Sequence, residues 1–140
     1  MREEKYLESV QRDILRSKKW KRFVRRLDIG KEERVNIKAL PVRFVWYLPG
    51  NGKTTYHSIM ACYKDEIVVS DMVYGTMSLN MIRHALTHEL AHLYLMVNDV
   101  PYHDQALLFH KALEYLKIDL EVDLTTRYRR KTGKDRRWKS

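Results

Sequence analysis

The sequence predicts an α+β domain, in which helices precede and follow a small sheet. Two long segments, residues 2–29 and 78–97, repeat apolar residues with the 3.6-residue period of a helix. Between them, short runs of β-branched and aromatic residues are separated by turn-forming residues. We therefore expect an N-terminal helix, a small and mostly antiparallel three-stranded sheet, a long helix and a following helix. A chain of 140 residues, 44% of them hydrophobic, is typical of one domain, which we place at residues 1–124 before a basic tail at 125–140.

The first helix is expected over residues 2–29. Apolar residues recur every three or four positions along it, and the opposite face is basic. Gly30 follows as a residue that commonly ends a helix. The apolar positions are Tyr6, Leu7, Val10, Ile14, Leu15, Trp20, Phe23, Val24 and Leu27, and the basic positions are Arg12, Arg16, Lys19, Arg22 and Arg26.

Three strands are expected after this helix. Residues 41–48 and 54–63 flank the turn-forming run at 49–52, which predicts a hairpin between the two strands. Residues 67–70 are a third, shorter run. The second strand contains Cys62, the one cysteine of the chain, so no disulfide can form within the chain. The apolar residues around Cys62 predict a buried structural thiol.

The strongest helical pattern lies at residues 78–97. Ser78 is a suitable N-cap, and Pro101 favours an end to the helix shortly before it. A further helix is expected over residues 103–116. The apolar stripe of the helix at 78–97 consists of Leu79, Ile82, Leu86, Leu90, Leu93 and Val97.

The positive charge of the chain is concentrated at its two ends. Residues 1–34 hold 12 Lys and Arg against 7 Asp and Glu, residues 125–140 hold 8 against 1, and residues 35–124 hold 7 against 10. Basic ends favour a polyanionic partner, and we expect non-specific binding of DNA. The expected DNA contacts are Arg16, Lys19, Arg22, Arg26, Arg129, Arg130 and Lys131.

The hydropathy of the chain argues against a membrane protein. No apolar run approaches the ~20 residues that span a bilayer. The charged start, residues 1–6, is not followed by the apolar stretch of a signal peptide. We expect a monomeric cytoplasmic protein, with association to the nucleoid left open.

The motif His88-Glu89-Leu90-Ala91-His92 carries the chemistry that the sequence predicts. Residues four apart lie on one face of a helix, so His88 and His92 can bind one zinc ion at ~2.0–2.1 Å. Glu89 is rotated by about 100° around the helix axis and can approach a water bound to the metal. There it can act as general base and then as general acid, which predicts a metallohydrolase.

A catalytic zinc usually takes three protein ligands, so one more is needed. His103 follows His92 after a turn and is the expected third ligand, with His110 and Glu114 as rivals. His84, one turn before His88, is expected beside the ligands or at the surface. Tyr74, Tyr94 and Tyr102 are candidate donors to an oxyanion, and nothing in the sequence selects one of them.

At these residues the chain resembles the SprT-like metalloprotease family, which includes the Spartan DNA–protein crosslink proteases. The likeness lies in the run at 86–93, in the run at 103–107, and in the order of a basic helix, short strands and the metal helix. The resemblance implies a zincin-like fold, one catalytic Zn²⁺ held by His88, His92 and His103, and Glu89 as catalytic acid and base. It also implies a protein substrate associated with DNA. A chain with one cysteine cannot build the zinc ribbon of many relatives, so it corresponds to a minimal protease domain.

Two other functions stay open. The first is a zinc protease of one regulatory protein, independent of DNA, whose basic ends bind an acidic protein. The second is a non-catalytic, zinc-stabilised module that binds nucleic acid. Stimulation of cleavage by DNA separates the first from the leading interpretation, and a closed site with four protein ligands would indicate the second.

Overall fold

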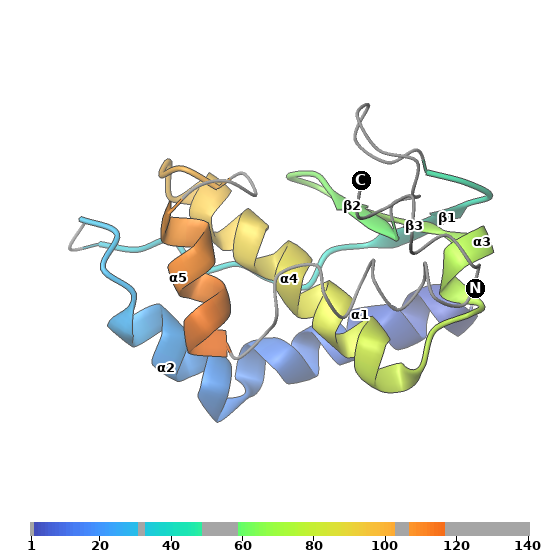
Figure 1. The fold of residues 1–140 in the computed structure, drawn as a ribbon, viewed down its shortest axis with the longest axis horizontal. Helices are drawn as coiled ribbons and strands as arrows, with labels where there is room; N and C mark the ends of the chain where they lie inside the picture. Colours follow the sequence, from blue (N-terminus) through green and yellow to red (C-terminus); the bar gives the residue numbers. More distant parts are fainter. Residues whose placement is uncertain (1, 31–32, 49–58, 103–106, 117–140) are drawn as a thin grey trace, which may run out of the picture.

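The computed structural model describes residues 2–30, 33–48, 59–102 and 107–116. Within these ranges the chain is a mixed α+β structure of five helices and one three-stranded sheet, as the sequence predicts at this level. In Figure 1 the sheet lies at one end of the molecule and α2 and α5 at the other. The elements are α1 (Arg2–Arg16), α2 (Lys18–Arg26), β1 (Val42–Val45), β2 (Met60–Cys62), β3 (Ile67–Ser70), α3 (Asp71–Tyr74), α4 (Leu79–Val97) and α5 (Leu107–Leu116).

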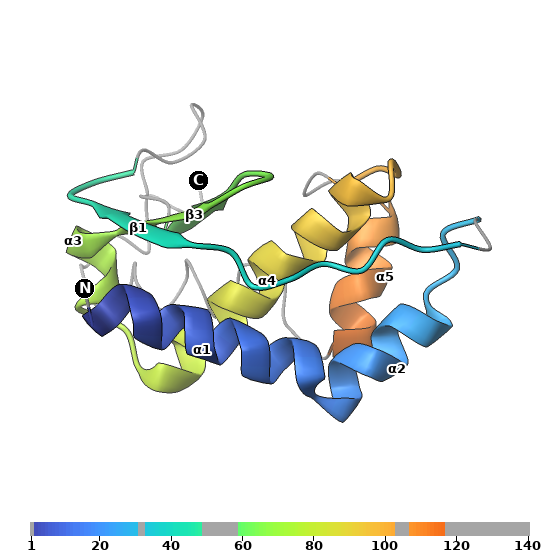
Figure 2. The same ribbon diagram turned by 180° about the vertical axis from the view of Figure 1, so that it is seen from behind.

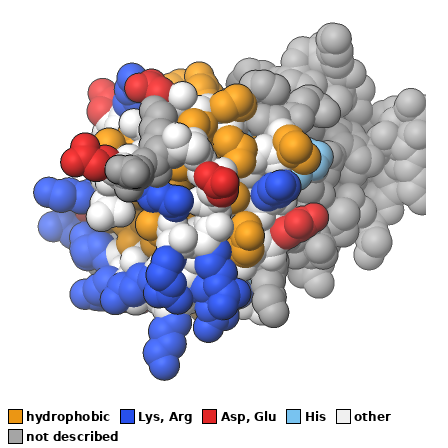
Figure 3. Space-filling model, turned by 90° about the vertical axis from the view of Figure 1, so that its left-hand side faces the viewer, with side chains coloured by type: hydrophobic (Ala, Val, Ile, Leu, Met, Phe, Trp, Pro, Cys, Tyr) orange, Lys and Arg blue, Asp and Glu red, His pale blue; other side chains and the backbone are white. Residues whose placement is uncertain are grey.

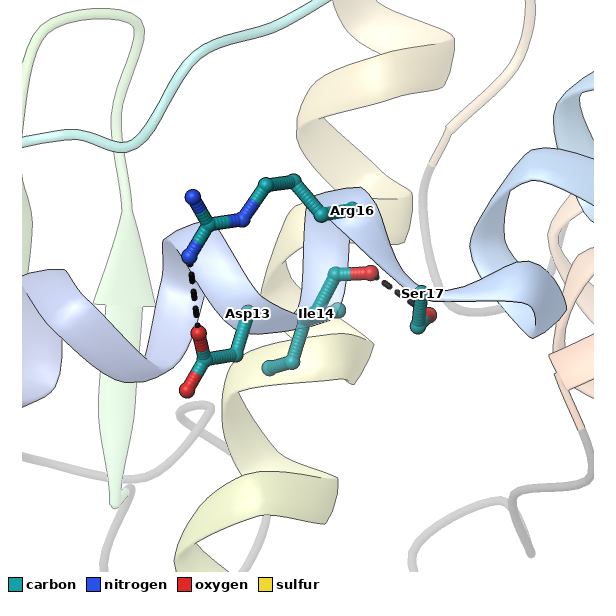
Figure 4. A network of polar contacts seen from close by, with 4 residues as sticks. All are labelled: Asp13, Ile14, Arg16 and Ser17. Carbon is teal, nitrogen blue, oxygen red and sulfur yellow. Dashed lines mark hydrogen bonds and ion pairs between the residues drawn. The ribbon is translucent and has the colours of Figure 1, made fainter.

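The single helix predicted over residues 2–29 is wrong, because the chain bends at Ser17 between α1 and α2. Ser17 has an extended backbone, with φ −70° and ψ 154°. Its hydroxyl donates a hydrogen bond to the carbonyl of Ile14 at 2.7 Å (Figure 4). The same hydroxyl accepts a hydrogen bond from the backbone N–H of Trp20 at 3.2 Å. Serine in this role caps a new helix instead of continuing the old one. We call this bend the elbow.

The first helical region also ends earlier than predicted. Helix α2 ends at Arg26, where the C-cap residue Leu27 takes an extended backbone, before the predicted stop at Gly30. Gly30 has φ +75°, a backbone conformation that glycine adopts without strain, and its N–H donates to the carboxylate of Asp28 at 2.9 Å. Gly30 therefore turns the chain after the helix and does not itself cap it.

The predicted hairpin between the first two strands is wrong. The sheet order is β1-β3-β2, so β3 lies between them. Strand β1 pairs with β3 in parallel, with Val42 opposite Ile67, and β2 pairs with β3 in antiparallel, with Met60 opposite Val69. The sheet is thus half parallel, not mostly antiparallel. All four residues of β3 are buried, and an apolar strand buried on both faces takes the centre of a sheet.

Helix α4 is the centre of the fold, and its predicted position is confirmed. Ser78 caps it by accepting a hydrogen bond from the N–H of Met81 at 3.2 Å. The helix packs against β2, α5 and α1 (Figure 1). It is buried around most of its circumference, beyond the single stripe expected, because elements cover it on several sides. Its buried residues are Met81, Ile82, Ala85, Leu86, Thr87, His88, Leu90, Ala91, Leu93, Tyr94 and Leu95.

Residues 33–41 form an extended segment that runs along the outside of the helices to β1 (Figure 2). Two buried amide side chains hold its backbone. Gln11 of α1 donates to the carbonyl of Leu40 at 3.0 Å and accepts from its N–H at 2.8 Å. Asn98, at the end of α4, makes the same pair with Val35 at 3.0 and 2.8 Å. These two clamps pair backbone groups of the segment as a neighbouring strand would.

The last predicted helix, at 103–116, is confirmed from Leu107 to Leu116. Its first four predicted residues, 103–106, lie outside the described residues, as does the predicted tail at 125–140. None of the helices in the described ranges combines the length and apolar character needed to cross a membrane.

Candidate metal centre

His88 and His92 lie side by side on α4. Their ring centres are 5.0 Å apart, and the ring planes are inclined at 70° to one another. Two imidazoles that bind one tetrahedral zinc at ~2.0–2.1 Å place their ring centres roughly 5 Å apart. His88 is 7% exposed and His92 is half-buried, so the pair stands at the edge of the core. The spacing therefore fits two ligands of one ion, as the motif predicts.

A backbone group determines which nitrogen of His92 can face a metal. The Nδ1 atom of His92 is in hydrogen-bond contact with the carbonyl oxygen of Tyr102. A carbonyl can only accept, so Nδ1 carries the proton, and the lone pair of the neutral ring lies on Nε2. Zinc-binding histidines commonly donate their other ring N–H to a carbonyl or carboxylate in this way. The contact thus prepares His92 to bind through Nε2.

Phe109 of α5 packs against both histidines. Its ring stacks on His92 with centres 3.8 Å apart and planes 13° apart, and it meets His88 edge-on with centres 5.0 Å apart. Phe109 is fully buried, so it cannot move aside without opening the core. The contact with Phe109 therefore limits the orientations that the two imidazoles can take. In the sequence Phe109 appears only as one apolar residue of a helical pattern, and its contact with the histidines depends on how α5 docks on α4.

Glu89 is half-buried, and its charge reaches Cys62 in strand β2. Burial, and then the negative charge of Glu89, raise the pKa of the Cys62 thiol to about 12. Cys62 is half-buried, so the expectation of a buried thiol is wrong. Among the described strands, β2 pairs with β3 alone, so Cys62 is covered by a neighbouring strand on one side. Strand β2 and the predicted general base therefore lie close together.

Within the described ranges, no group of three His, Cys, Asp or Glu side chains comes close enough to hold a metal. His110 and Glu114 are exposed on α5 and do not join the pair. His103 lies outside the described residues and stays a prediction. It follows directly after Tyr102, whose carbonyl contacts His92.

The three tyrosines proposed as oxyanion donors lie in different places. Tyr94 is fully buried against Trp20 and Phe23 of α2, with ring centres 6.1 and 5.3 Å away, on the opposite side of α4 from the histidines. The hydroxyl of Tyr74 donates to Glu3 at 2.8 Å, and burial together with this bond raises the pKa of Tyr74. Tyr102 is partly exposed and is joined to the site through its backbone. Of the three, only Tyr102 contacts a histidine of the pair in the described structure.

The predicted basic face is divided between two helices. Arg16, on α1, forms an exposed ion pair with Asp13 at 3.0 Å (Figure 4). Lys19, Arg22 and Arg26 are exposed on α2, beyond the elbow. Figure 3 faces the end of the molecule where α2 lies and shows Lys and Arg side chains gathered along one edge. The predicted contacts Arg129, Arg130 and Lys131 lie outside the described residues.

Comparisons of the chain with protein-family models, with curated proteins and with solved structures gave no match. The resemblance to SprT-like proteases therefore rests on the residues of the motif and their order. What the described structure adds is local: paired imidazoles, a backbone acceptor that determines a tautomer, and a carboxylate one residue away. Such a set can bind a divalent metal and move a proton beside it.

Proposed function

We propose that the chain is a zinc-dependent endopeptidase that acts on proteins associated with DNA. One observation carries the proposal: His88 and His92 have ring centres 5.0 Å apart, and Nδ1 of His92 contacts a carbonyl, so that Nε2 can bind metal. The donor set of neutral imidazoles suits zinc. We assign His103 as the third ligand, since it follows the residue whose carbonyl contacts His92.

A zinc ion bound there would polarise the scissile carbonyl and lower the pKa of a water molecule. The residues of the chain then have distinct tasks. Nε2 of His92 and a ring nitrogen of His88 would hold the metal, and Phe109 limits how far both rings can rotate. The carboxylate of Glu89 takes a proton from the attacking water and returns it to the nitrogen of the leaving amine.

The positive charge of α2 is the observation that supports DNA binding. Helix α2 has the sequence KKWKRFVRR, in which six of nine residues are cationic. These side chains are exposed and gather at one end of the molecule (Figure 3). Such a cluster attracts a polyanion without reading its sequence. A protease that carries it is expected to act where DNA holds the substrate.

The test compares zinc content and cleavage of casein or histone, with and without single-stranded DNA. We expect wild type to hold one equivalent of zinc and to cleave. Glu89→Gln should hold zinc and not cleave, because it keeps both imidazoles and removes the base. Glu114→Gln is the matched control, since it removes an exposed carboxylate from α5 and should behave as wild type. If wild type and Glu89→Gln both hold zinc and neither cleaves, the chain is a binding module and the proposal fails.

A further inference from the structure

A cavity of about 250 Å³ lies at the elbow, beside the first half of α4. Its apolar wall comes from Ile14 of α1 and Trp20 of α2. Its polar wall comes from Lys19 of α2 and from Asn80, Arg83 and His84 in the first half of α4. Leu116 of α5 completes the apolar wall, so four helices contribute to one cavity. A volume below the roughly 300–1,000 Å³ of sites for drug-sized ligands indicates a small ligand or one group of a larger one.

The described charges of this cavity have one sign. Lys19 and Arg83 line it, and none of the described lining residues is a carboxylate. Among the described residues, no carboxylate forms an ion pair with either cation, in contrast to Arg16 nearby, which pairs with Asp13. Asn80 adds an amide that can donate hydrogen bonds. Two cations without a described counter-charge beside neutral donors form a site for an anion.

The start of α2 strengthens the positive potential of the cavity. Ser17, the N-cap of α2, lines the cavity, so the positive end of the helix dipole lies at its wall. Lys18 and Lys19 occupy the first turn, which contains no acidic residue. Cations at this end of a helix oppose its dipole and are unfavourable on their own. An anion in the cavity would offset both the dipole and the two lysines.

We propose that this cavity binds one phosphate group of a single nucleic-acid strand, whose neighbouring phosphates follow the cations of α2. Lys19 and Arg83 are the anchors, from two different helices. The apolar wall that includes Trp20 suits the sugar beside the phosphate. The strand is favoured over a free phosphate because cations continue beyond the cavity, at Lys18 and Arg22 on the same helix.

This site deepens the DNA-binding part of the proposed function and does not depend on hydrolysis. No residue that lines the cavity belongs to the metal centre. The two sites share α4, since Thr87 lines the cavity and precedes His88. Loss of binding at one site can therefore be measured while the other stays intact.

The experiment measures binding of a short fluorescein-labelled oligothymidine by anisotropy at fixed salt. All proteins carry Glu89→Gln, so that cleavage cannot change the sample. Arg83→Gln and Lys19→Gln are compared with Arg12→Gln, which removes the same charge from an exposed position on α1 outside the cavity. We expect each cavity variant to weaken binding at least roughly tenfold, as loss of a charge-assisted hydrogen bond does. Arg12→Gln should weaken it less than about threefold, because Arg12 lies outside the cavity and would act on the strand only through screened, long-range charge.

Competition with inorganic phosphate identifies the source of the ligand. Saturating phosphate should displace the oligonucleotide from the parent protein and have a smaller effect on Arg83→Gln. Equal weakening by Arg83→Gln and Arg12→Gln would overturn the proposal, because net charge alone would then explain binding. Loss of phosphate binding in Arg83→Gln with unchanged oligonucleotide binding would also overturn it, in favour of a small phosphorylated ligand. Circular dichroism of each variant checks that these exposed substitutions leave the fold intact.

Discussion

On the face of α4 that meets α5 and β2, His88 and His92 are held by neighbours with defined geometry. Phe109 stacks on one ring at 3.8 Å, and a carbonyl contacts Nδ1 of that ring. On the face of α4 that meets α1 and α2, polar groups bind backbone or line a cavity. Asn98 holds a backbone segment, while Arg83 lines a cavity. We call these the histidine face and the elbow face.

The difference shows how one helix can carry two kinds of site. Binding of a metal needs ligands held in a narrow geometry, so the histidine face is packed with rings. Binding of an anion needs charge and donors but tolerates more movement, so the elbow face keeps long, exposed cations. Substitutions on the histidine face should therefore have all-or-none effects on metal binding. Substitutions on the elbow face should cause graded changes in the free energy of unfolding or in the affinity for DNA.

The largest effect is expected from removing a metal ligand. His92→Ala deletes one of two paired imidazoles, so zinc affinity should fall by more than the roughly 10–100-fold that loss of an outer partner costs. The fold should persist, because His92 is half-buried and α4 keeps its apolar residues. Zinc content by atomic absorption, with circular dichroism beside it, measures both. His110→Ala is the control, and a variant His92→Ala with full zinc content would refute the centre.

Phe109→Ala is expected to come next. It removes a fully buried ring, which should lower the free energy of unfolding by about 3–5 kcal/mol. It should also weaken zinc binding, since the stacked partner of His92 is gone. Phe109→Leu keeps most of the apolar volume without the stack, so it should weaken zinc binding at a smaller cost in stability. Urea unfolding and zinc titration of both variants separate the two roles, and unchanged zinc affinity in both would show that the stack is not needed.

Asn98→Ala tests the elbow face. Asn98 pairs with the N–H and carbonyl of Val35 and also donates to the carbonyl of Tyr94 at 2.8 Å. Losing these bonds in a buried place should lower the free energy of unfolding by about 2–4 kcal/mol and leave zinc affinity unchanged. Tyr94→Phe is the matched control, since the buried Tyr94 hydroxyl has no hydrogen-bond partner among the described residues. That variant should change stability by less than about 1 kcal/mol, toward higher stability.

The smallest effect concerns the chemistry of Cys62. Its pKa is raised to about 12, so the thiol is the favoured form over the whole neutral range and the reactive thiolate is scarce. In metal-free protein, alkylation by iodoacetamide at pH 8 should be slower than for an unperturbed cysteine. It should rise as pH approaches 12. Glu89→Gln removes the negative charge that helps to raise the pKa of Cys62, so alkylation should become modestly faster. An alkylation rate identical to that of wild type would show that Glu89 does not act on Cys62.

Local signals predicted part of this structure. Helix α4 could be predicted because Ser78 caps it and its period is unbroken over five turns. The pair His88 and His92 followed from the same period. The elbow could not be predicted, because the apolar spacing continues across Ser17 and the bend depends on one hydroxyl. The strand order could not be predicted either, since burial of β3 on both faces is a tertiary property that a local turn signal does not reveal.

The candidate site, too, could be predicted only in part from the sequence. The motif names the side chains of His88, Glu89 and His92, and the structure places the two histidines together. The motif cannot identify the carbonyl of Tyr102, because every residue has a carbonyl and only the fold brings this one to His92. Phe109 was visible only as one more apolar position in a helical pattern. Those two groups determine how the imidazoles are held, and neither has a pattern of its own.

The position of β3 also bears on the order in which the sheet forms as the chain is synthesised. Strand β2 can pair with β3 as soon as both exist, across the short turn in which Tyr63 donates to the carbonyl of Glu66. Strand β1 is made before either, yet its partner in the sheet is β3. Until Ser70 has left the ribosome, the apolar residues of β1 lack the strand that lies beside them in the described sheet. The delay exposes β1 to other chains during translation, and α1, which packs against β1 and is made first, is the element that can cover it.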